Sequence, residues 1–179
     1  MSKHFISYLL ALLPLFFLTD CKKWFKDEEF TLIRQSFSGT ELRVDGYYYY
    51  DKDGVIFCSY FFYRNGVMVD GGASVSGSSN PIAFLDSTFR KSYFAENIKK
   101  DKTCWGVFDI HNDSIVFERW INKQGGFPVL RFSGNIINDT TFRITRSEYP
   151  HHGEMYERNA VFHFHAFSPK PDSTNVFIP

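Results

Sequence analysis

The sequence has little cysteine, no surplus of charge of either sign and no apolar run long enough to cross a bilayer as a helix. It holds 3 cysteines in 179 residues, which is a thin basis for a disulfide framework. Lys and Arg number 20, as do Asp and Glu, so the formal net charge is zero. This balance argues against a nucleic-acid partner, because phosphate binding needs an excess of positive charge. The length predicts one domain around one core.

Common catalytic signatures are also missing. The chain has no Gly-x-Ser-x-Gly elbow, no Gly-x-x-x-x-Gly-Lys phosphate loop and no His-Glu-x-x-His zinc helix. Asp51-Lys52-Asp53-Gly54 resembles part of a calcium loop, but Gly54 as its sixth residue would put Tyr49 first and Tyr60 last. Neither tyrosine supplies a carboxylate, which excludes that reading. The sequence therefore predicts a protein that is not an enzyme and has no cofactor.

Aromatic residues are abundant. They make up 19% of the chain, with 21 Phe and 10 Tyr. Rings at this density bury themselves, which excludes disorder over most of the length. Phe and Tyr also suit a pleated, half-buried surface, so β-sheet is favoured over helix.

The N-terminus has the pattern of a targeting signal. The apolar run from Phe5 to Leu18 is shorter than the ~20 residues that a spanning helix needs and is typical of a signal-peptide core. The run ends in Leu18-Thr19-Asp20-Cys21, which resembles the lipobox of small bacterial lipoproteins. Leu18 and Thr19 match the first two positions of that motif. Asp20 departs from it, because the residue before the cysteine is normally Gly, Ala or Ser.

The lipoprotein resemblance implies a cellular location. It implies that residues 1–20 are removed and that Cys21 is acylated, palmitate among the acyl groups, with residues 21–40 as a tether to the outer membrane. Two or more acyl chains hold a protein almost permanently on a membrane, which would then be its partner. The charged run 26–29 is similar to the surface-export tether of some lipoproteins, or it is a solvated linker. The sequence therefore leaves open whether the domain lies on the periplasmic side or at the cell surface. The alternative is an ordinary secretory signal or an uncleaved anchor.

From residue 41 onward, the pattern predicts strands joined by tight turns. Apolar and polar residues alternate with period two, and Asn65-Gly66 indicates a hairpin in which both turn residues have positive φ. Asn80-Pro81 is a typical helix start and predicts a helical insertion over 81–100, as one bent helix or two short ones. The expected strands are 42–50, 55–64, 67–69, 103–110, 114–122, 127–137, 140–146 and 160–167.

The short connections require antiparallel neighbours, which predicts a mainly β antiparallel meander. Eight such strands remove their exposed edges by closing into a barrel. The layout resembles a lipocalin-type or fatty-acid-binding-type barrel over about 41–167, within a single domain at 41–168. An open two-sheet β-sandwich is the alternative. Residues 169–179 are expected to be an extended tail, because their prolines remove backbone donors.

Histidines near the end of the chain form a candidate zinc site. His163 and His165 lie two residues apart on one predicted strand, and His151 or Glu154 could complete a set of ligands. The alternative is that the phenylalanines between them face the core while the histidines face water.

A second candidate metal site is the alternation of Asp109, His111 and Asp113, whose side chains share a face on an extended strand. The same residues are equally typical of a hairpin turn. Away from Cys21, Cys58 and Cys104 are either joined in a disulfide or buried as free thiols.

These features together favour a lipid-anchored envelope protein that binds without catalysing a reaction. An aromatic-rich barrel offers a mouth or interior for a hydrophobic small molecule or a glycan. The alternative is a structural or protein-interaction lipoprotein of the envelope whose core is fully packed. No nucleic-acid partner is expected.

Overall fold

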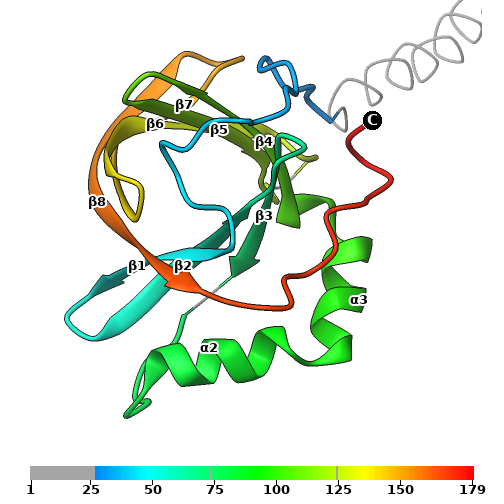
Figure 1. The fold of residues 1–179 in the computed structure, drawn as a ribbon. Coiled ribbons are helices and arrows are strands. Elements are labelled where there is room, and N and C mark those ends of the chain that lie inside the picture. Colours follow the sequence, from blue (N-terminus) through cyan, green and yellow to red (C-terminus); the bar gives the residue numbers. More distant parts are fainter. Residues whose placement is uncertain (1–26, 73, 124) are drawn as a thin grey trace, which may run out of the picture.

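The computed structural model describes residues 27–72, 74–123 and 125–179. The predicted signal peptide 1–20 and the predicted lipidation site Cys21 lie outside the described residues. Within them, eight strands form a closed barrel in which each strand pairs with the next and β8 pairs with β1 (Figure 1). All of the pairs are antiparallel. The predicted meander barrel is confirmed, and the two-sheet sandwich is wrong.

The strands are β1 Gly46–Lys52, β2 Val55–Phe62, β3 Val67–Gly72, β4 Trp105–His111, β5 Ser114–Trp120, β6 Val129–Asn138, β7 Thr141–Tyr149 and β8 Glu154–Ala166. The largest difference from the prediction is the start of β8, well before the expected residue 160. Residues 154–159 are exposed along their whole length. Their side chains therefore lack the apolar alternation by which a half-buried strand is recognised.

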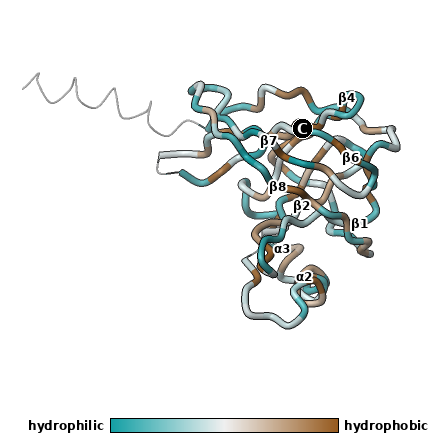
Figure 2. The backbone as a smooth tube through the Cα atoms, turned by 90° about the vertical axis from the view of Figure 1, so that its left-hand side faces the viewer, coloured by the Kyte–Doolittle hydropathy of each residue, from teal (hydrophilic) through white to brown (hydrophobic). Residues whose placement is uncertain are grey.

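The helical insertion lies between β3 and β4, as predicted. It consists of α2 Pro81–Phe89 and α3 Ser92–Lys100, followed by a short 3₁₀ turn η2 Lys102–Cys104. The Asn80 side chain caps α2 by accepting a hydrogen bond from the backbone N–H of Ala83 at 3.0 Å. Both helices lie together on one side of the barrel (Figure 2).

The Asn65-Gly66 turn joins β2 to β3 as predicted, but its geometry differs. Of the two residues only Gly66 has a positive φ, at 80°, so the prediction of two positive φ angles is wrong. Instead the Asn65 side chain accepts a hydrogen bond from the backbone N–H of Val67. A Cβ atom on Gly66 would lie 2.0 Å from the carbonyl oxygen of Gln35. Glycine is thus required here both by the turn and by the N-terminal segment that crosses it.

The barrel interior is filled mainly by aromatic rings, which we call the interior cluster. Phe142 and Phe162 stack face to face with 4.8 Å between ring centroids, and Phe117 stacks on Phe132 at 4.9 Å. Such pairs add stability beyond the area they bury. The buried members of the interior cluster are Leu42, Tyr48, Tyr60, Phe62, Met68, Phe108, Ile115, Phe117, Phe142, Ile144 and Phe162.

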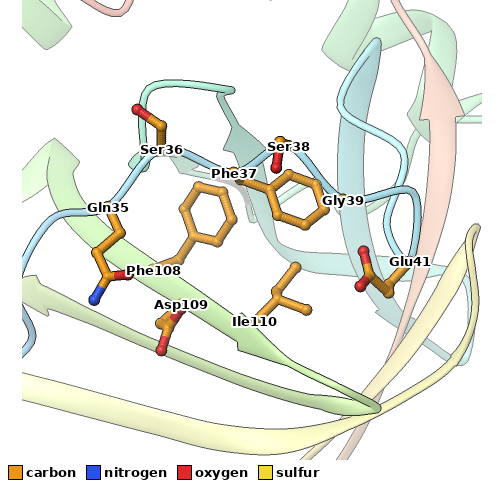
Figure 3. A pocket seen from close by; sticks show the side chains of 9 residues that line it. All are labelled: Gln35, Ser36, Phe37, Ser38, Gly39, Glu41, Phe108, Asp109 and Ile110. Carbon is orange, nitrogen blue, oxygen red and sulfur yellow. The ribbon is translucent and has the colours of Figure 1, made fainter.

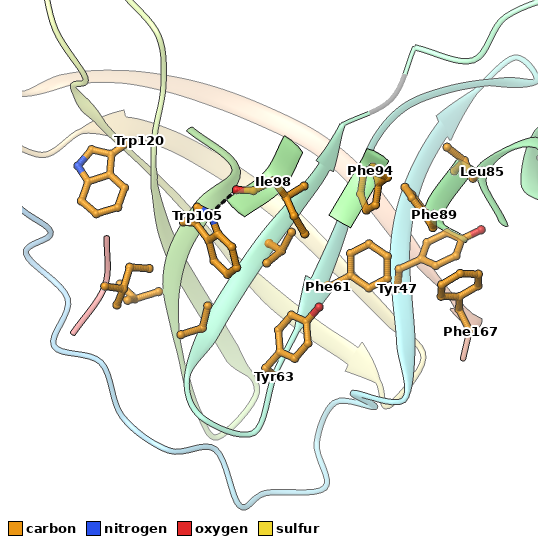
Figure 4. Close-up of a cluster of buried hydrophobic side chains, with 14 of the residues drawn as sticks. Tyr47, Phe61, Tyr63, Leu85, Phe89, Phe94, Ile98, Trp105, Trp120 and Phe167 are labelled. Atoms are coloured by element: carbon orange, nitrogen blue, oxygen red, sulfur yellow. Dashed lines mark hydrogen bonds between the residues drawn. The ribbon is translucent and has the colours of Figure 1, made fainter. Parts of the chain in front are cut away.

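A second apolar cluster, the outer cluster, covers the outside of β1–β5 (Figure 4). Phe89 of α2 packs against Tyr47 and Phe61 of the barrel wall, with ring centroids 5.1 and 5.0 Å apart. The indole N–H of Trp105 donates a hydrogen bond to the carbonyl oxygen of Ile98 in α3 at 2.6 Å. Because this part of the sheet is buried on both faces, its strands contain continuous apolar runs such as Tyr47–Tyr50.

Both ends of the described part of the chain pack on this barrel. Phe30 and Leu32 contact the outer cluster, so the tether predicted at 21–40 is part of the fold from residue 27 onward. The tail 169–179 forms no strand, as expected, but it also packs: Ile178 is buried and the Tyr63 hydroxyl donates to the carbonyl oxygen of Pro171 at 2.7 Å.

Candidate functional site: the open end of the barrel

The two ends of the barrel differ. We call the end with the β2–β3, β4–β5 and β6–β7 turns the capped end, because residues 35–45 cross it before they enter β1. Leu42 closes it with 1% of its surface exposed. The backbone N–H of Arg43 and the hydroxyl of Tyr48 both donate to the carbonyl oxygen of Asp139, at 2.9 and 2.6 Å. The other end, with the β1–β2, β5–β6 and β7–β8 turns and both ends of the helical β3–β4 connection, is the open end.

A small pocket lies at the capped end, between the crossing segment and β4 (Figure 3). Its volume is about 240 Å³, below the ~300 Å³ at which small-molecule pockets begin. Phe37 and Phe108 meet edge to face beside it, and carboxylates of Glu41 and Asp109 lie toward opposite sides. Its size and acidic lining make it the weaker candidate.

At the open end, solvent reaches side chains that point into the barrel. Tyr50 and Cys58 are cross-strand partners on β1 and β2, and Phe132 lies opposite Phe117. Tyr50, Cys58 and Phe132 contact the interior cluster yet are only partly buried, whereas Phe117 is fully buried. The barrel is therefore packed through its middle, and we call the partly exposed inward side chains at this end, Tyr50, Cys58 and Phe132, the cup.

The barrel wall is incomplete beside the cup. β8 pairs with β7 from Glu154 to His163, but it pairs with β1 only from His163 to Ala166. The pairing of β1 with β2 shifts register between Tyr50 and Asp51, close to the point where β1 stops pairing with β8. In the described part of the chain, residues 154–162 thus have one strand edge without a partner strand. The seam between β1 and β8 opens toward the cup.

An ion pair lies on the inner wall of the cup. Nη1 of Arg119 on β5 is 3.0 Å from Oδ2 of Asp70 on β3, with side chains 20% and 14% exposed. The other carboxylate oxygen of Asp70 accepts from the backbone N–H of Gly72 at 2.8 Å. Nε of Arg119 is buried and has no hydrogen-bond partner among the described residues. A buried donor without a partner costs about 1–3 kcal/mol, a cost that an oxygen acceptor would remove.

The groups around the ion pair stay protonated. Burial lowers the pKa of Arg119, but the charge of Asp70 together with contributions from Tyr60 and Cys58 outweighs it, so this pKa is raised overall. Burial raises the pKa of the Tyr60 hydroxyl well above 10 and, together with the Asp70 charge, that of the Cys58 thiol to about 12. Burial and nearby Asp101 likewise raise the pKa of Cys104 to about 12. Neutral thiols are poor nucleophiles, so the cup is suited to hydrogen bonding rather than to covalent chemistry.

Cys58 and Cys104 are both free thiols, so the disulfide alternative is wrong for this structure. Cys58 lies on β2, whereas Cys104 ends η2 just before β4, and β3 lies between β2 and β4. Two strand spacings put β2 and β4 about 9–10 Å apart. A disulfide needs Cα atoms within about 7 Å.

The histidines of the candidate zinc site do not converge. His165 Nε2 lies 3.2 Å from Oδ2 of Asp86 on α2, while His163 is exposed beside the Tyr49 ring. His151 is in the β7–β8 turn, where it contacts the carbonyl oxygen of Glu29 at 2.8 Å. Phe162 and Phe164 contact the interior cluster, as the alternative reading expected.

Asp109 and His111 lie at the end of β4, and Asp113 lies in the tight turn that follows. Asn112 between them has a φ of 52°, which places it in the left-handed region that tight turns use. Across the residues that the structure describes, no group of three or more His, Cys, Asp or Glu side chains could hold a metal ion. Neither predicted metal site is supported.

Sequence reasoning missed a buried carboxylate on the outer face of β5. Glu118 is 0% exposed and accepts hydrogen bonds from the backbone N–H groups of Thr31 and Leu32, at 2.7 and 3.0 Å. It also accepts from the Thr31 hydroxyl at 2.6 Å and from Nε of Arg131 at 2.9 Å. This carboxylate fastens the N-terminal segment to the barrel wall. Its position between Phe117 and Arg119 looks like an ordinary outward polar residue in sequence.

A scan against protein-family models, and searches of curated proteins and of solved structures, find no match to this chain. No helix in the described ranges is long and apolar enough to span a membrane.

Proposed function

We propose that the chain is a lipid-anchored envelope protein of the outer membrane that binds a small hydrophobic molecule or a glycan in the cup at the open end, without catalysis. Cys21 carries the lipid in this proposal. The observation that carries the binding role is the partial exposure of inward-facing aromatic side chains beside a partly buried ion pair. Ligand sites generally combine an apolar lining with a few fixed polar groups in this way.

Each part of the cup has a role in the proposal. The rings of Tyr50 and Phe132 supply apolar contact for a hydrocarbon or for the carbon face of a sugar. Arg119 and Asp70 neutralise each other, so the ligand needs no net charge of its own. A hydroxyl or carbonyl oxygen near Nε of Arg119 would give that donor the partner it lacks.

Native mass spectrometry of protein purified from its own membranes tests the binding role. We expect the folded wild type to carry an added mass that is released on unfolding. Ala160→Phe adds a ring between the packed middle and the open end, because Ala160 is a partly exposed residue of β8 that contacts the interior cluster opposite Ile144. That variant should lose the added mass. Ala83→Phe, on the exposed side of α2, is the matched control and should keep it.

A wild type without any added mass would contradict the binding role and favour the structural alternative. The packed middle of the barrel is what that alternative expects. The anchor is tested separately, by metabolic labelling with a palmitate analogue. The wild type should be labelled and Cys21→Ala should not, and equal labelling of both would contradict the lipid at Cys21.

A further inference from the structure

The described chain begins at the open end of the barrel. The Asp27 carboxylate pairs with Nζ of Lys102 at 2.6 Å, just before β4. The carbonyl oxygen of Glu28 accepts from the indole N–H of Trp120, the last residue of β5, at 2.7 Å. The Glu28 side chain accepts from the backbone N–H of Val129, the first residue of β6, at 2.7 Å. All three partners belong to the strand ends that surround the cup.

The β7–β8 turn of the same end also holds this segment. Nε2 of His152 lies 2.6 Å from the Glu28 carboxylate, and Nε2 of His151 lies 2.8 Å from the carbonyl oxygen of Glu29. Further along, Glu118 fixes the segment to the outer wall. The point at which the chain leaves the domain toward its N-terminus is therefore tied at several places.

The number of residues before this point limits how far the domain can move from an anchor at Cys21. Six residue steps join Cys21 to Asp27. At full extension they span at most about 22 Å. A seven-residue strand such as β5 is itself about 23 Å long, so the capped end lies roughly one strand length farther from the anchor than the open end.

The rim of the open end carries exposed apolar side chains. Phe57 follows the β1–β2 turn and is 50% exposed, while Met155 and Tyr156 follow the β7–β8 turn and are 58% and 44% exposed. We call these three residues the rim. Exposed apolar side chains at the end of a domain that is nearest to its anchor are suited to contact with a lipid surface. The adjoining stretch Asp51-Lys52-Asp53 exposes two carboxylates and one ammonium group, which favours a surface without strong negative charge.

We infer that the rim lies against the membrane that holds Cys21, so that the cup opens onto the lipid surface. This inference rests on the proposed lipid anchor. It makes the ligand an amphipathic molecule that passes between the bilayer and the cup. The open seam between β1 and β8 then gives an acyl chain or ring system a lateral path past Tyr50.

Hydrogen–deuterium exchange on the full lipidated chain in phosphatidylcholine vesicles tests the orientation. The reference is the Cys21→Ala chain mixed with the same vesicles. We expect amides of residues 51–57 and 152–158 to exchange at least threefold more slowly in the anchored protein. Amides of residues 110–114 and 137–141, at the capped end, should exchange at equal rates in both. Equal rates at the open end, or slowing at the capped end, would overturn the inference.

Variants separate the orientation from the anchor. Serine at Phe57, Met155 and Tyr156 together should abolish the slowing, whereas Ile137→Ser, at an equally exposed position near the capped end, should retain it. Twenty Gly and Ser residues inserted after Lys26 should also reduce it, because the longer tether frees the domain. Flotation of each sample reports the anchor. A wild type that does not float refutes the anchor and this inference together, while one that floats with an unprotected rim refutes the orientation alone.

Discussion

The buried carboxylate of Glu118 should be among the most costly side chains to remove from this protein. It accepts hydrogen bonds from two backbone N–H groups and one hydroxyl of the N-terminal segment, and it pairs with Arg131. Glu118→Ala leaves the two N–H groups and the guanidinium without this acceptor. Removing one partner of a buried ion pair typically costs about 3–5 kcal/mol. Arg131 keeps its contact with Glu148 at 3.1 Å, so we expect a loss of about 3 kcal/mol.

Urea unfolding at pH 7 measures this loss as a lower midpoint at unchanged slope. Glu148→Ala is the control, since Glu148 pairs with the same arginine and with Arg146 but accepts no hydrogen bond from the described residues of the N-terminal segment. It should lose less than half as much stability. Glu118→Gln keeps the shape and should fold with an intermediate loss. Equal losses of stability in Glu118→Ala and Glu148→Ala would refute the reasoning, because the hydrogen bonds from the N-terminal segment to Glu118 would then contribute nothing to the free energy of unfolding.

Three further predictions follow from burial. Phe61→Ala, at 0% exposure in the outer cluster, should lower the free energy of unfolding in urea by about 3–5 kcal/mol. Phe57→Ala, at the exposed rim, should lower it by less than about 1 kcal/mol. Similar losses in the two variants would contradict the packing of the outer cluster. Cys58 and Cys104 should react with a thiol reagent at pH 8 more than about tenfold more slowly in the native protein than in urea. If neither cysteine reacts in urea before a reductant is added, the two are joined in a disulfide and the prediction of free thiols is wrong. Burial lowers the pKa of Lys170 from 10.5 to about 8, so between pH 8 and 10 the unfolded chain binds more protons at this residue and stability rises with pH. The wild type should gain about 1–2 kcal/mol relative to Lys170→Met over that interval, and parallel curves would contradict the buried ammonium.

The sequence was sufficient to predict the barrel because its signals are local. Alternation and turn residues mark each strand, and short connections allow only antiparallel neighbours. The prediction of β8 was less complete because residues 154–159 face solvent on both sides and lack alternation. The positive φ expected at Asn65 was wrong because its side chain bonds to the backbone of Val67 instead.

The cup could not be predicted in the same way. Asp70 and Arg119 lie on strands that are not neighbours in sequence, and each reads as a polar residue of an alternating strand. Only closure of the barrel turns both toward the interior, where β3 and β5 are separated by β4 alone. The outward Glu118 was missed for the related reason that its partners, Thr31 and Leu32, lie more than 80 residues away.

The N-terminal segment connects these observations. Residues 27–45 begin at the open end, cross Glu118 on the outer wall and then cover the capped end with Leu42 before β1 starts. The same stretch of chain therefore receives any pull from an anchor and also closes the barrel. Because the contacts of Glu28 and Glu118 fix the segment ahead of Leu42, they would hold the cap in place under a pull from the proposed anchor. A charged, weakly apolar stretch that looks like a linker in sequence is thus a structural part of the domain. A chain that begins at residue 41 would lack Glu28 and Phe30 and would expose Trp120.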